Sequence, residues 1–256
     1  MHKPLRPNCP PETERLVVGL QPVREAIRVH RSKLLRVAIE DRDQPRLAAL
    51  ERFARDSGVS AVARVDRSEL DGLSGSTSHQ GALAWAPPLA LIDPSAALPG
   101  TDGLSVALDQ IQDPQNFGAI VRSAVALAGA PIVWGEHSSA PLTPATFRAS
   151  AGAIEHARLC RVPSLVSWLS EAASSGARVI GLDSHASVPL GAVDLTLATV
   201  LVIGNEHEGL ARGVRRACTT MATVAPRGPI DSLNASAAAA VALYEAARQR
   251  ARVQSG

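Results

Sequence analysis

The sequence predicts an α/β protein with two domains, and three observations support this expectation. The chain has 256 residues, more than one average domain of about 150 residues needs. Short apolar runs alternate with segments of helical period along most of the chain. A proline-rich stretch, residues 87–102, interrupts both patterns once. We therefore expect a smaller α/β domain at 15–86, a linker at 87–102 and a larger α/β domain at 103–256.

The sequence predicts a short lead followed by a smaller domain of alternating helices and strands. Residues 1–14 contain four prolines and no apolar run, so we expect a disordered lead and no signal peptide. Turn signals then separate short elements of alternating type. The expected elements are a helix at 21–29, a strand at 35–40, a helix at 44–57, and strands at 59–65 and 81–86.

The first predicted helix carries a possible basic stripe. Arg24, Arg28 and Arg31 are spaced i, i+4 and i+7, which places them on one helical face. Such a stripe is typical of a phosphate contact with RNA. It is equally typical of a solvated face opposite Val23 and Ile27, and the sequence leaves both readings open.

The larger domain alternates more regularly between strands and helices. Its strand-like runs are rich in Val, Ile and Leu, which indicates strands buried on both faces of a mostly parallel sheet. Ligands of such sheets bind at the carboxyl ends of the strands. The expected strands are 104–109, 131–135, 157–162, 178–183, 199–204 and 221–225, and the expected helices are 115–129, 164–176 and 232–252.

Polar segments follow three of these strands, at 109–123, 205–210 and 226–236. Asn116 stands where the N-cap of a helix is expected, and Ser232 and Asn234 stand at the start of the last helix. Glu206 follows a strand, where a carboxylate favours a helix dipole. Each segment alone is therefore also explained by helix capping.

Several general motifs are missing from the chain. There is no Gly-x-Gly-x-x-Gly, no P-loop and no Gly-x-Ser-x-Gly. The histidines are scattered, and Cys9, Cys160 and Cys218 are odd in number and far apart, so we expect neither a metal site nor a disulfide framework. No apolar stretch is long enough to span a membrane. These absences favour a cytoplasmic protein whose chemistry uses polar loops.

The composition excludes some ways of binding nucleic acid. The 26 basic residues against 24 acidic ones leave a net charge of only +2, which argues against a histone-like polycation. Lys3 and Lys33 are the only lysines, so nearly every basic group is an arginine, whose planar fork suits phosphate. A GC-rich genome explains the same bias. Three Phe, three Trp and one Tyr are too few for a stacking platform.

Taken together and in order, the polar segments resemble the motifs of the SpoU/TrmH branch of the SPOUT superfamily, the knotted RNA ribose 2′-O-methyltransferases. The similarity covers the larger domain. The smaller domain, through 18–26 and 79–81, resembles the L30e-like substrate-binding module of the same family. The matching motifs are Asp113-Pro114-Gln115-Asn116-Phe117-Gly118 to Arg122 with its second half at Arg148-Ala149-Ser150-Ala151-Gly152-Ala153, then Gly204-Asn205-Glu206-His207-Glu208-Gly209, and Ser232-Leu233-Asn234-Ala235-Ser236-Ala237.

The resemblance implies a parallel sheet with a C-terminal trefoil knot, S-adenosylmethionine as cofactor, no metal, and a homodimer that acts on structured RNA. By residue match it implies two sets of site residues. The catalytic set is Asn116, Arg122, Glu206, Ser232 and Asn234, and the cofactor set is Ile203, Gly204, Asn205, Val224 and Leu233. Arg24, Arg28, Arg31 and Arg148 are expected to contact RNA.

The chemistry expected of these residues starts from Arg122. A guanidinium has a pKa above about 12 and is a poor base. We therefore expect Arg122 to grip a phosphate and to stabilise the developing alkoxide, with proton removal shared by another group. Gly204 is expected to allow close approach of the cofactor at a strand end. His207 and Pro226 depart from the family pattern and are expected to alter cofactor affinity.

The expected function is 2′-O-methylation of a ribose, most like the family branch that modifies a guanosine of 23S rRNA. One alternative is a tRNA ribose methyltransferase. The other is an inactive RNA-binding or ribosome-assembly factor with the same fold, although such a scaffold has no chemical need for all five expected catalytic residues.

Overall fold

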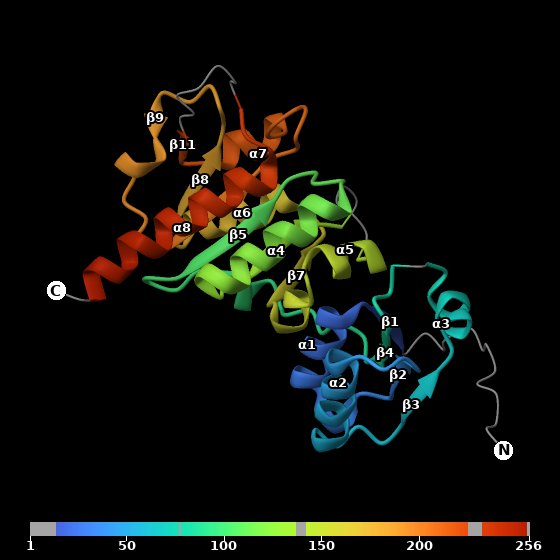
Figure 1. Ribbon diagram of the computed structural model, residues 1–256. Helices are drawn as coiled ribbons and strands as arrows, with labels where there is room; N and C mark the ends of the chain where they lie inside the picture. Colours follow the sequence, from blue (N-terminus) through green and yellow to red (C-terminus); the bar gives the residue numbers. More distant parts are fainter. Residues whose placement is uncertain (1–13, 77, 137–141, 225–231, 255–256) are drawn as a thin grey trace. The chain divides into compact units, whose positions relative to one another are not determined.

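The computed structural model describes residues 14–76, 78–136, 142–224 and 232–254. The chain divides into two compact units, Met1–Leu89 and Ala90–Gly256 (Figure 1). Within the described ranges no helix has the length and apolar character that crossing a membrane requires.

The first unit is built on a four-stranded mixed sheet with the strand order β1-β4-β2-β3. Strand β4 runs antiparallel to both of its neighbours, whereas β2 and β3 are parallel. Two of these elements, β1 and α3, were not anticipated, because each is too short to show a clear period. The elements are β1 (Arg15–Val18), α1 (Leu20–His30), β2 (Arg36–Glu40), α2 (Pro45–Asp56), β3 (Val62–Val65), α3 (Arg67–Ser74) and β4 (Ala82–Ala86).

Alternate residues of this sheet feed two separate cores. Val17 and Ile39 pack with residues of α1 and α2 on one face. Val18 and Leu83 pack with Leu70 of α3 on the other. The period of two in the strands therefore places helices on both faces.

The predicted basic stripe of the first unit is only partly confirmed. Arg24 and Arg28 lie on α1 and are exposed, and Arg28 donates to Glu25 at 2.7 Å. Arg31 is also exposed, but α1 ends at His30 and Arg31 has a φ of 50°, so it does not continue the helical face. The i+7 spacing was wrong for this residue because the helix stops one position before it.

The second unit contains a seven-stranded sheet with the order β7-β6-β5-β10-β8-β11-β9, and every pair in it is parallel. The predicted α/β class and parallel sheet are thus confirmed. The short elements α5, α7 and β9 were not anticipated. The elements are β5 (Leu104–Leu108), α4 (Pro114–Ala128), β6 (Ile132–Gly135), α5 (Pro144–Ala149), β7 (Leu159–Val162), α6 (Leu165–Ser174), β8 (Arg178–Leu182), β9 (Val188–Pro189), β10 (Thr199–Ile203), α7 (Arg212–Ala217), β11 (Thr220–Thr223) and α8 (Ala235–Gln254).

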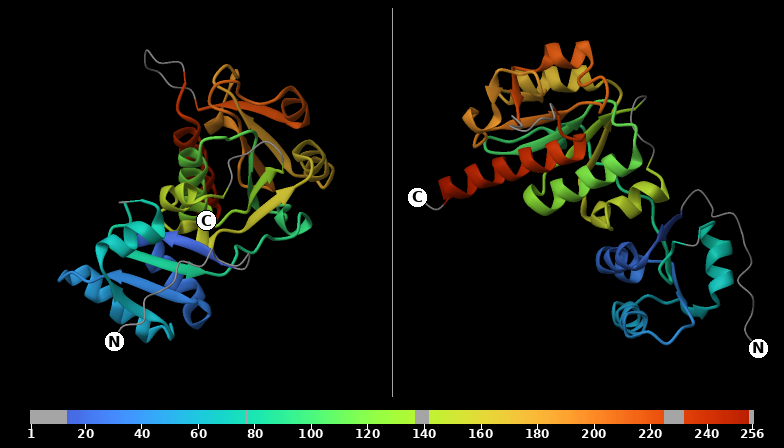
Figure 2. Two further views of the ribbon diagram at one scale, coloured as in Figure 1. Left: turned by 90° about the vertical axis from the view of Figure 1, so that its right-hand side faces the viewer. Right: turned by 45° about the horizontal axis from the view of Figure 1, so that its top comes forward.

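Helices cover both faces of this sheet (Figure 2). On one side α6 and α7 pack on each other, and Trp168 of α6 and Val214 of α7 join Val133 and Val202 of the strands in one core. On the other side α4 and α8 lie along each other. Buried on both faces, the central strands place their functional side chains only at their ends.

The strand order reverses direction between β5 and β10. From β5 the chain adds β6 and β7 on one side, and it then crosses to build β8, β10 and β11 on the other. A crevice outside the carboxyl ends of the strands is expected at such a switch point. The fold therefore points to the segments that follow β5 and β10.

The remaining expectations concern the disordered lead, the proline-rich linker and the trefoil knot. Most of the expected lead, 1–14, lies outside the described residues. Part of the proline-rich stretch packs on the second unit, since Ile92 donates its N–H to the carbonyl oxygen of Leu159 at 2.8 Å and Ala97 is buried. The chain between β10 and α8 includes 225–231, which the structure does not describe, and the trefoil knot stays a prediction.

Candidate functional site

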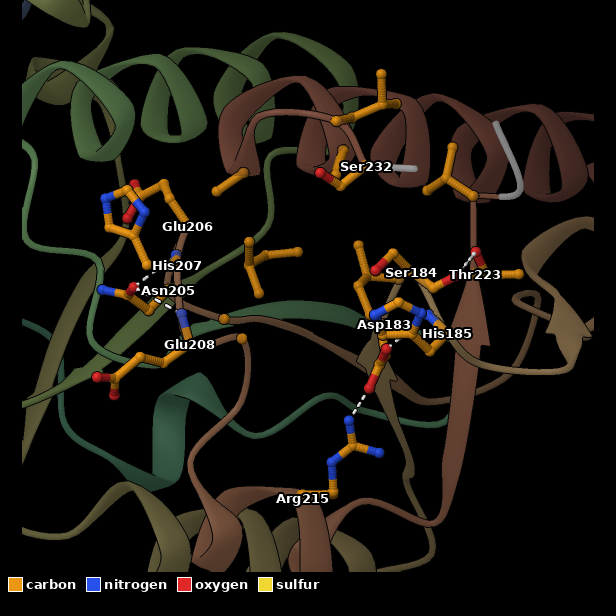
Figure 3. A pocket seen from close by; sticks show the side chains of 18 residues that line it. Asp183, Ser184, His185, Asn205, Glu206, His207, Glu208, Arg215, Thr223 and Ser232 are labelled. Carbon is orange, nitrogen blue, oxygen red and sulfur yellow. Dashed lines mark hydrogen bonds and ion pairs between the residues drawn. The ribbon is translucent and has the colours of Figure 1, made fainter. Parts of the chain in front are cut away.

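A cavity of about 420 Å³ lies at the carboxyl ends of β8, β10 and β11, beside the start of α8 (Figure 3). Its walls combine two polar groups with glycine and apolar side chains between them. The lining residues are Leu182, Asp183, Ser184, His185, Ile203, Gly204, Asn205, Glu206, His207, Glu208, Gly209, Arg215, Thr223, Val224, Ser232, Leu233, Ala235 and Ala238.

The loop after β10 folds back on itself. The backbones of Asn205 and Gly209 exchange two hydrogen bonds of 3.0 Å, and Asn205 Oδ1 accepts the N–H of His207 at 2.8 Å. A Cβ at position 204 would lie 2.5 Å from the carbonyl carbon of Gly209. The glycine at 204 is therefore required by the returning backbone of its own loop, a reason that the sequence did not reveal.

The segment after β5 holds this loop at three points. Gln110 accepts a hydrogen bond from Asn205 Nδ2 at 2.8 Å, and Asn116 Nδ2 donates to Glu206 Oε1 at 2.5 Å. The Asp109 carboxylate accepts the N–H of Ala211 at 2.7 Å. Three points of the loop are thus tied to one segment that lies 90 to 102 residues away in the chain.

Asp109 is the buried member of these contacts. Its carboxyl group is only 4% exposed, and burial raises its pKa above the ordinary value. The hydrogen bond from Ala211 opposes this shift. Cys218 is half-buried nearby, and desolvation of its thiol raises the pKa to about 11, so the thiol stays protonated and is no nucleophile near neutral pH.

The expected N-cap at Asn116 was wrong. Asp113 caps α4, because its side chain accepts the N–H of Gln115 at 2.9 Å and Pro114 follows as the first helical residue. Asn116 lies inside the first turn, 8% exposed, and is free to bond Glu206. The Glu206 carboxylate consequently approaches the amino end of α4, which belongs to an earlier part of the chain.

The predicted residues around α8 divide between lining and capping. Val224, Ser232 and Leu233 line the cavity. Asn234 does not; its Oδ1 accepts the N–H of Ser236 at 2.9 Å and caps α8. Its capping role, which the sequence left open, is confirmed.

Arg122 lies apart from the cavity of its own chain. It is exposed on α4, and the described residues offer it no hydrogen bond or ion pair. Arg148, on α5, is half-buried and also does not line the cavity. The expected RNA contacts Arg24, Arg28 and Arg31 belong to the first unit.

A second polar group in the cavity was missed by the sequence analysis. Asp183 accepts the N–H of His185 at 2.7 Å and forms an ion pair with Arg215, which reaches it from α7 (Figure 3). Ser184 and Thr223 lie beside them. A signal was available for part of this group, because the predicted strand 178–183 ends at Asp183, and Ser184 and His185 follow it as the other clusters follow their strands.

The arrangement suits a medium-sized organic ligand with polar ends. The cavity lies within the range of about 300 to 1,000 Å³ that such ligands occupy. Carboxylates at Glu206 and Glu208 provide negative charge at one end. No group of His, Cys, Asp and Glu that could hold a metal ion occurs among the residues the structure describes. His207 lines the cavity, whereas Pro226 lies outside the described residues.

Comparison with known proteins matches both units. The model of the SpoU rRNA Methylase family matches residues 103–244, and a model for RNA 2′-O ribose methyltransferase substrate binding matches residues 16–91. An uncharacterized tRNA/rRNA methyltransferase of Mycolicibacterium smegmatis is 39% identical over 245 residues, which are 93% of this chain and 77% of that protein.

Two solved structures illustrate the likeness of fold. The SpoU methyltransferase AviRb from Streptomyces viridochromogenes, in complex with the cofactor AdoMet, has a TM-score of 0.76 at 27% identity and covers 94% of this chain and 92% of its own. A protein studied for 2-OH methylation of C/U34 on tRNA has a TM-score of 0.53 at 32% identity, over 58% of this chain and 97% of its own.

Proposed function

The chain belongs to the SpoU rRNA Methylase family and is an RNA 2′-O-ribose methyltransferase that uses S-adenosylmethionine, and from this premise we propose that it methylates a guanosine ribose of 23S rRNA in the cytoplasm. One observation supports the methyl-transfer site above all others. Residues 204–209 of the loop line the cavity, while Asn116 of α4 holds the loop's carboxylate Glu206.

The residues of the cavity fit the cofactor. The resemblance to the family implies contacts at Ile203, Gly204, Asn205, Val224 and Leu233, and all five line the cavity. Apolar side chains such as Ile203, Val224 and Leu233 line the cavity together with polar ones, which suits an adenosine with a sulfonium chain. When bound, S-adenosylmethionine supplies an electrophilic methyl group on sulfur.

The chain's own residues then orient and stabilise the reacting groups. Asn116 fixes Glu206, and Asn234 fixes the start of α8 beside Ser232. Holding the reactants in line contributes as much as roughly 7–11 kcal/mol to such a reaction. In our proposal Arg122 grips the target phosphate through two N–H groups and stabilises the developing alkoxide.

Arg122 serves the cavity of a second copy in this proposal. It is exposed on α4 and does not line the cavity of its own chain. The neighbouring helix α8 exposes Val241 and Tyr244, and α4 exposes Leu127, which together provide an apolar face for a homodimer.

Replacement of Arg122 by lysine tests the role of the fork. Lys keeps the charge but loses the bidentate geometry, so methylation should slow by about 100-fold while S-adenosylmethionine binds unchanged. The measurements are transfer of a tritiated methyl group to deproteinised rRNA, and calorimetry with the cofactor. Full methylation by Arg122→Lys at unchanged RNA affinity would contradict the bidentate role.

Mixed dimers test whether the site is shared. Arg122→Ala subunits and Gly204→Val subunits are each expected to be inactive. After exchange, about a quarter of wild-type activity should return, because half of random dimers are mixed and each has one intact site. No recovery, with exchange verified by two affinity tags, would contradict the shared site.

The RNA substrate is tested by deletion of the gene and mapping of alkali-resistant linkages. We expect one 2′-O-methyl guanosine to disappear from 23S rRNA. Loss of a mark from tRNA, with 23S rRNA intact, would instead establish the tRNA alternative.

A further inference from the structure

The short helix α7 presents three arginines on one face. Arg212, Arg215 and Arg216 are spaced i, i+3 and i+4, so their side chains neighbour one another. All three are exposed. Arg215 also lines the cavity, which places this face beside the cavity.

The helix itself gains little from this arrangement. Like charges three and four residues apart destabilise a helix, and six residues are too few to form one in isolation. Arg212 lies in the first turn, where a cation opposes the helix dipole, and Ala211 before it provides no side-chain cap. Only Arg215 and Arg216, in the last turn, complement the dipole. An anion lying along the face would remove the repulsion.

The backbone of α7 is well anchored. Val214 is 3% exposed in the core beneath α6, and the N–H of Ala211 is held by the buried Asp109. A Cβ at Gly213 would lie 3.3 Å from Val166 of α6, so the two helices are in close contact. The guanidinium groups are therefore carried by a fixed platform.

Two of the three charges are not neutralised by the residues that the structure describes. Arg215 pairs with Asp183. For Arg212 and Arg216, the described part of the chain provides neither an ion pair nor a hydrogen bond. Glu208 of the cavity loop is exposed and lines the cavity.

We infer that the α7 face formed by Arg212, Arg215 and Arg216 binds backbone phosphates of the RNA beside the nucleotide that enters the cavity. The inference rests on the proposed function, because it takes RNA as the macromolecule that reaches this cavity. Each planar guanidinium matches two phosphate oxygens. Such contacts position an RNA without reading its sequence.

The test is the salt dependence of RNA binding by the Arg212→Gln/Arg216→Gln double variant. The probe is a fluorescent RNA hairpin, titrated without methyl donor. Loss of two phosphate contacts should lower the slope of log affinity against log salt by about 1.4 to 1.8, so from 50 to 200 mM salt the wild type loses roughly 7- to 12-fold more affinity than the variant. The control variant Arg158→Gln/Arg178→Gln also removes two positive charges, but at the amino ends of the strands. It should leave the slope unchanged.

Two further variants and readouts make the result decisive. Arg212→Lys/Arg216→Lys should retain most of the slope, and the melting temperature of the Gln variant should stay the same or rise, since repulsion is removed. Equal slopes for the wild type and the Gln variant would overturn the inference. A lowered slope in a protein that methylates no RNA would uphold the inference and contradict the proposed function.

Discussion

A cavity lies at each end of the parallel strands in the seven-stranded sheet, at their amino ends (the amino edge) and at their carboxyl ends (the carboxyl edge). The polar side chains of the two cavities are bonded differently. At the amino edge a cavity of about 580 Å³ is lined by Arg158 and Arg250. Arg250 donates to the backbone carbonyls of Asp102, Gly103 and Leu197. At the carboxyl edge the cavity is smaller, at about 420 Å³. Cavity size alone would therefore have pointed to the wrong edge.

The bonding of the side chains distinguishes the two edges. Burial lowers the pKa of Arg250, and its donors satisfy carbonyl oxygens where the strands begin, so this arginine fastens α8 to the sheet. At the carboxyl edge Asn116 and Asp109 hold a loop, and Glu206 and Glu208 of that loop line the cavity. An arginine whose terminal nitrogens donate to backbone carbonyls indicates a structural role, whereas a loop held in place at the wall of a cavity indicates a site.

The largest expected effect comes from placing a methyl group at Gly204. In Gly204→Ala the Cβ would lie 2.5 Å from the Gly209 carbonyl carbon, so the loop must move. We expect the affinity for S-adenosylmethionine to fall at least about tenfold, which is 1.4 kcal/mol, and the free energy of unfolding to fall by about 1–3 kcal/mol. Calorimetry and urea unfolding measure the two effects.

The matched control lies at the amino edge. Gly100 lines the other cavity, and a Cβ there meets nothing within 4 Å. Gly100→Ala should change stability by less than about 0.5 kcal/mol and leave cofactor affinity unchanged. Wild-type affinity in Gly204→Ala would show that the returning loop does not shape the cofactor site.

The sequence predicted the long elements well and the short ones poorly. Strands β5 and β10 and helices α4 and α8 were expected within three residues of their observed ends, because the strands are continuous apolar runs and the helices are long. Helices α5 and α7, with six residues each, show no full period. The part of the cavity wall formed by Asp183 and Arg215 was missed, since Arg215 lies on the short helix α7.

The site residues were found in the right segments but often with the wrong role. The cap was placed at Asn116, although Asp113 followed by proline was the stronger signal. The Asn116 to Glu206 bond joins residues ninety positions apart, and no local pattern predicts it. Gly204 was expected to make room for a ligand, whereas the fold shows that Gly209 occupies that space.

A moderate effect is expected from removing the arginine that fastens the amino edge. Arg250→Met deprives three carbonyl oxygens of a donor, two of them exposed, and should lower the free energy of unfolding by about 1–2 kcal/mol. Cofactor affinity, measured where the variant is still folded, should be unchanged. Arg158→Met is the control: it removes one exposed bond, to Ala96 O, and should cost less than about 1 kcal/mol. Lost cofactor binding in folded Arg250→Met would mean that the two edges are coupled.

The smallest effects concern two carboxyl groups whose pKa values move in opposite directions. Burial raises the pKa of Asp109 at the carboxyl edge, so the folded state binds its proton more tightly than the unfolded state does. Stability then falls as pH rises from the ordinary value near 3.8 through the raised value. Hydrogen bonds from Arg248 lower the pKa of Glu245 on α8 from 4.5 to about 2, so its contribution is present above 4.5 and is lost as pH falls towards 2.

Single substitutions separate these two contributions. Urea unfolding between pH 2 and 7 should show that Glu245→Gln removes part of the acid-side loss of stability. Asp109→Asn, which keeps an oxygen for the N–H of Ala211, should remove part of the decline above pH 3.8. If both variants shifted the profile in the same direction, the two carboxyl groups could not be held by opposite forces. The two pKa shifts have opposite signs because the two carboxyl groups have different surroundings. Asp109 is buried where it holds the cavity loop, whereas Glu245 is paired with Arg248 along a helix.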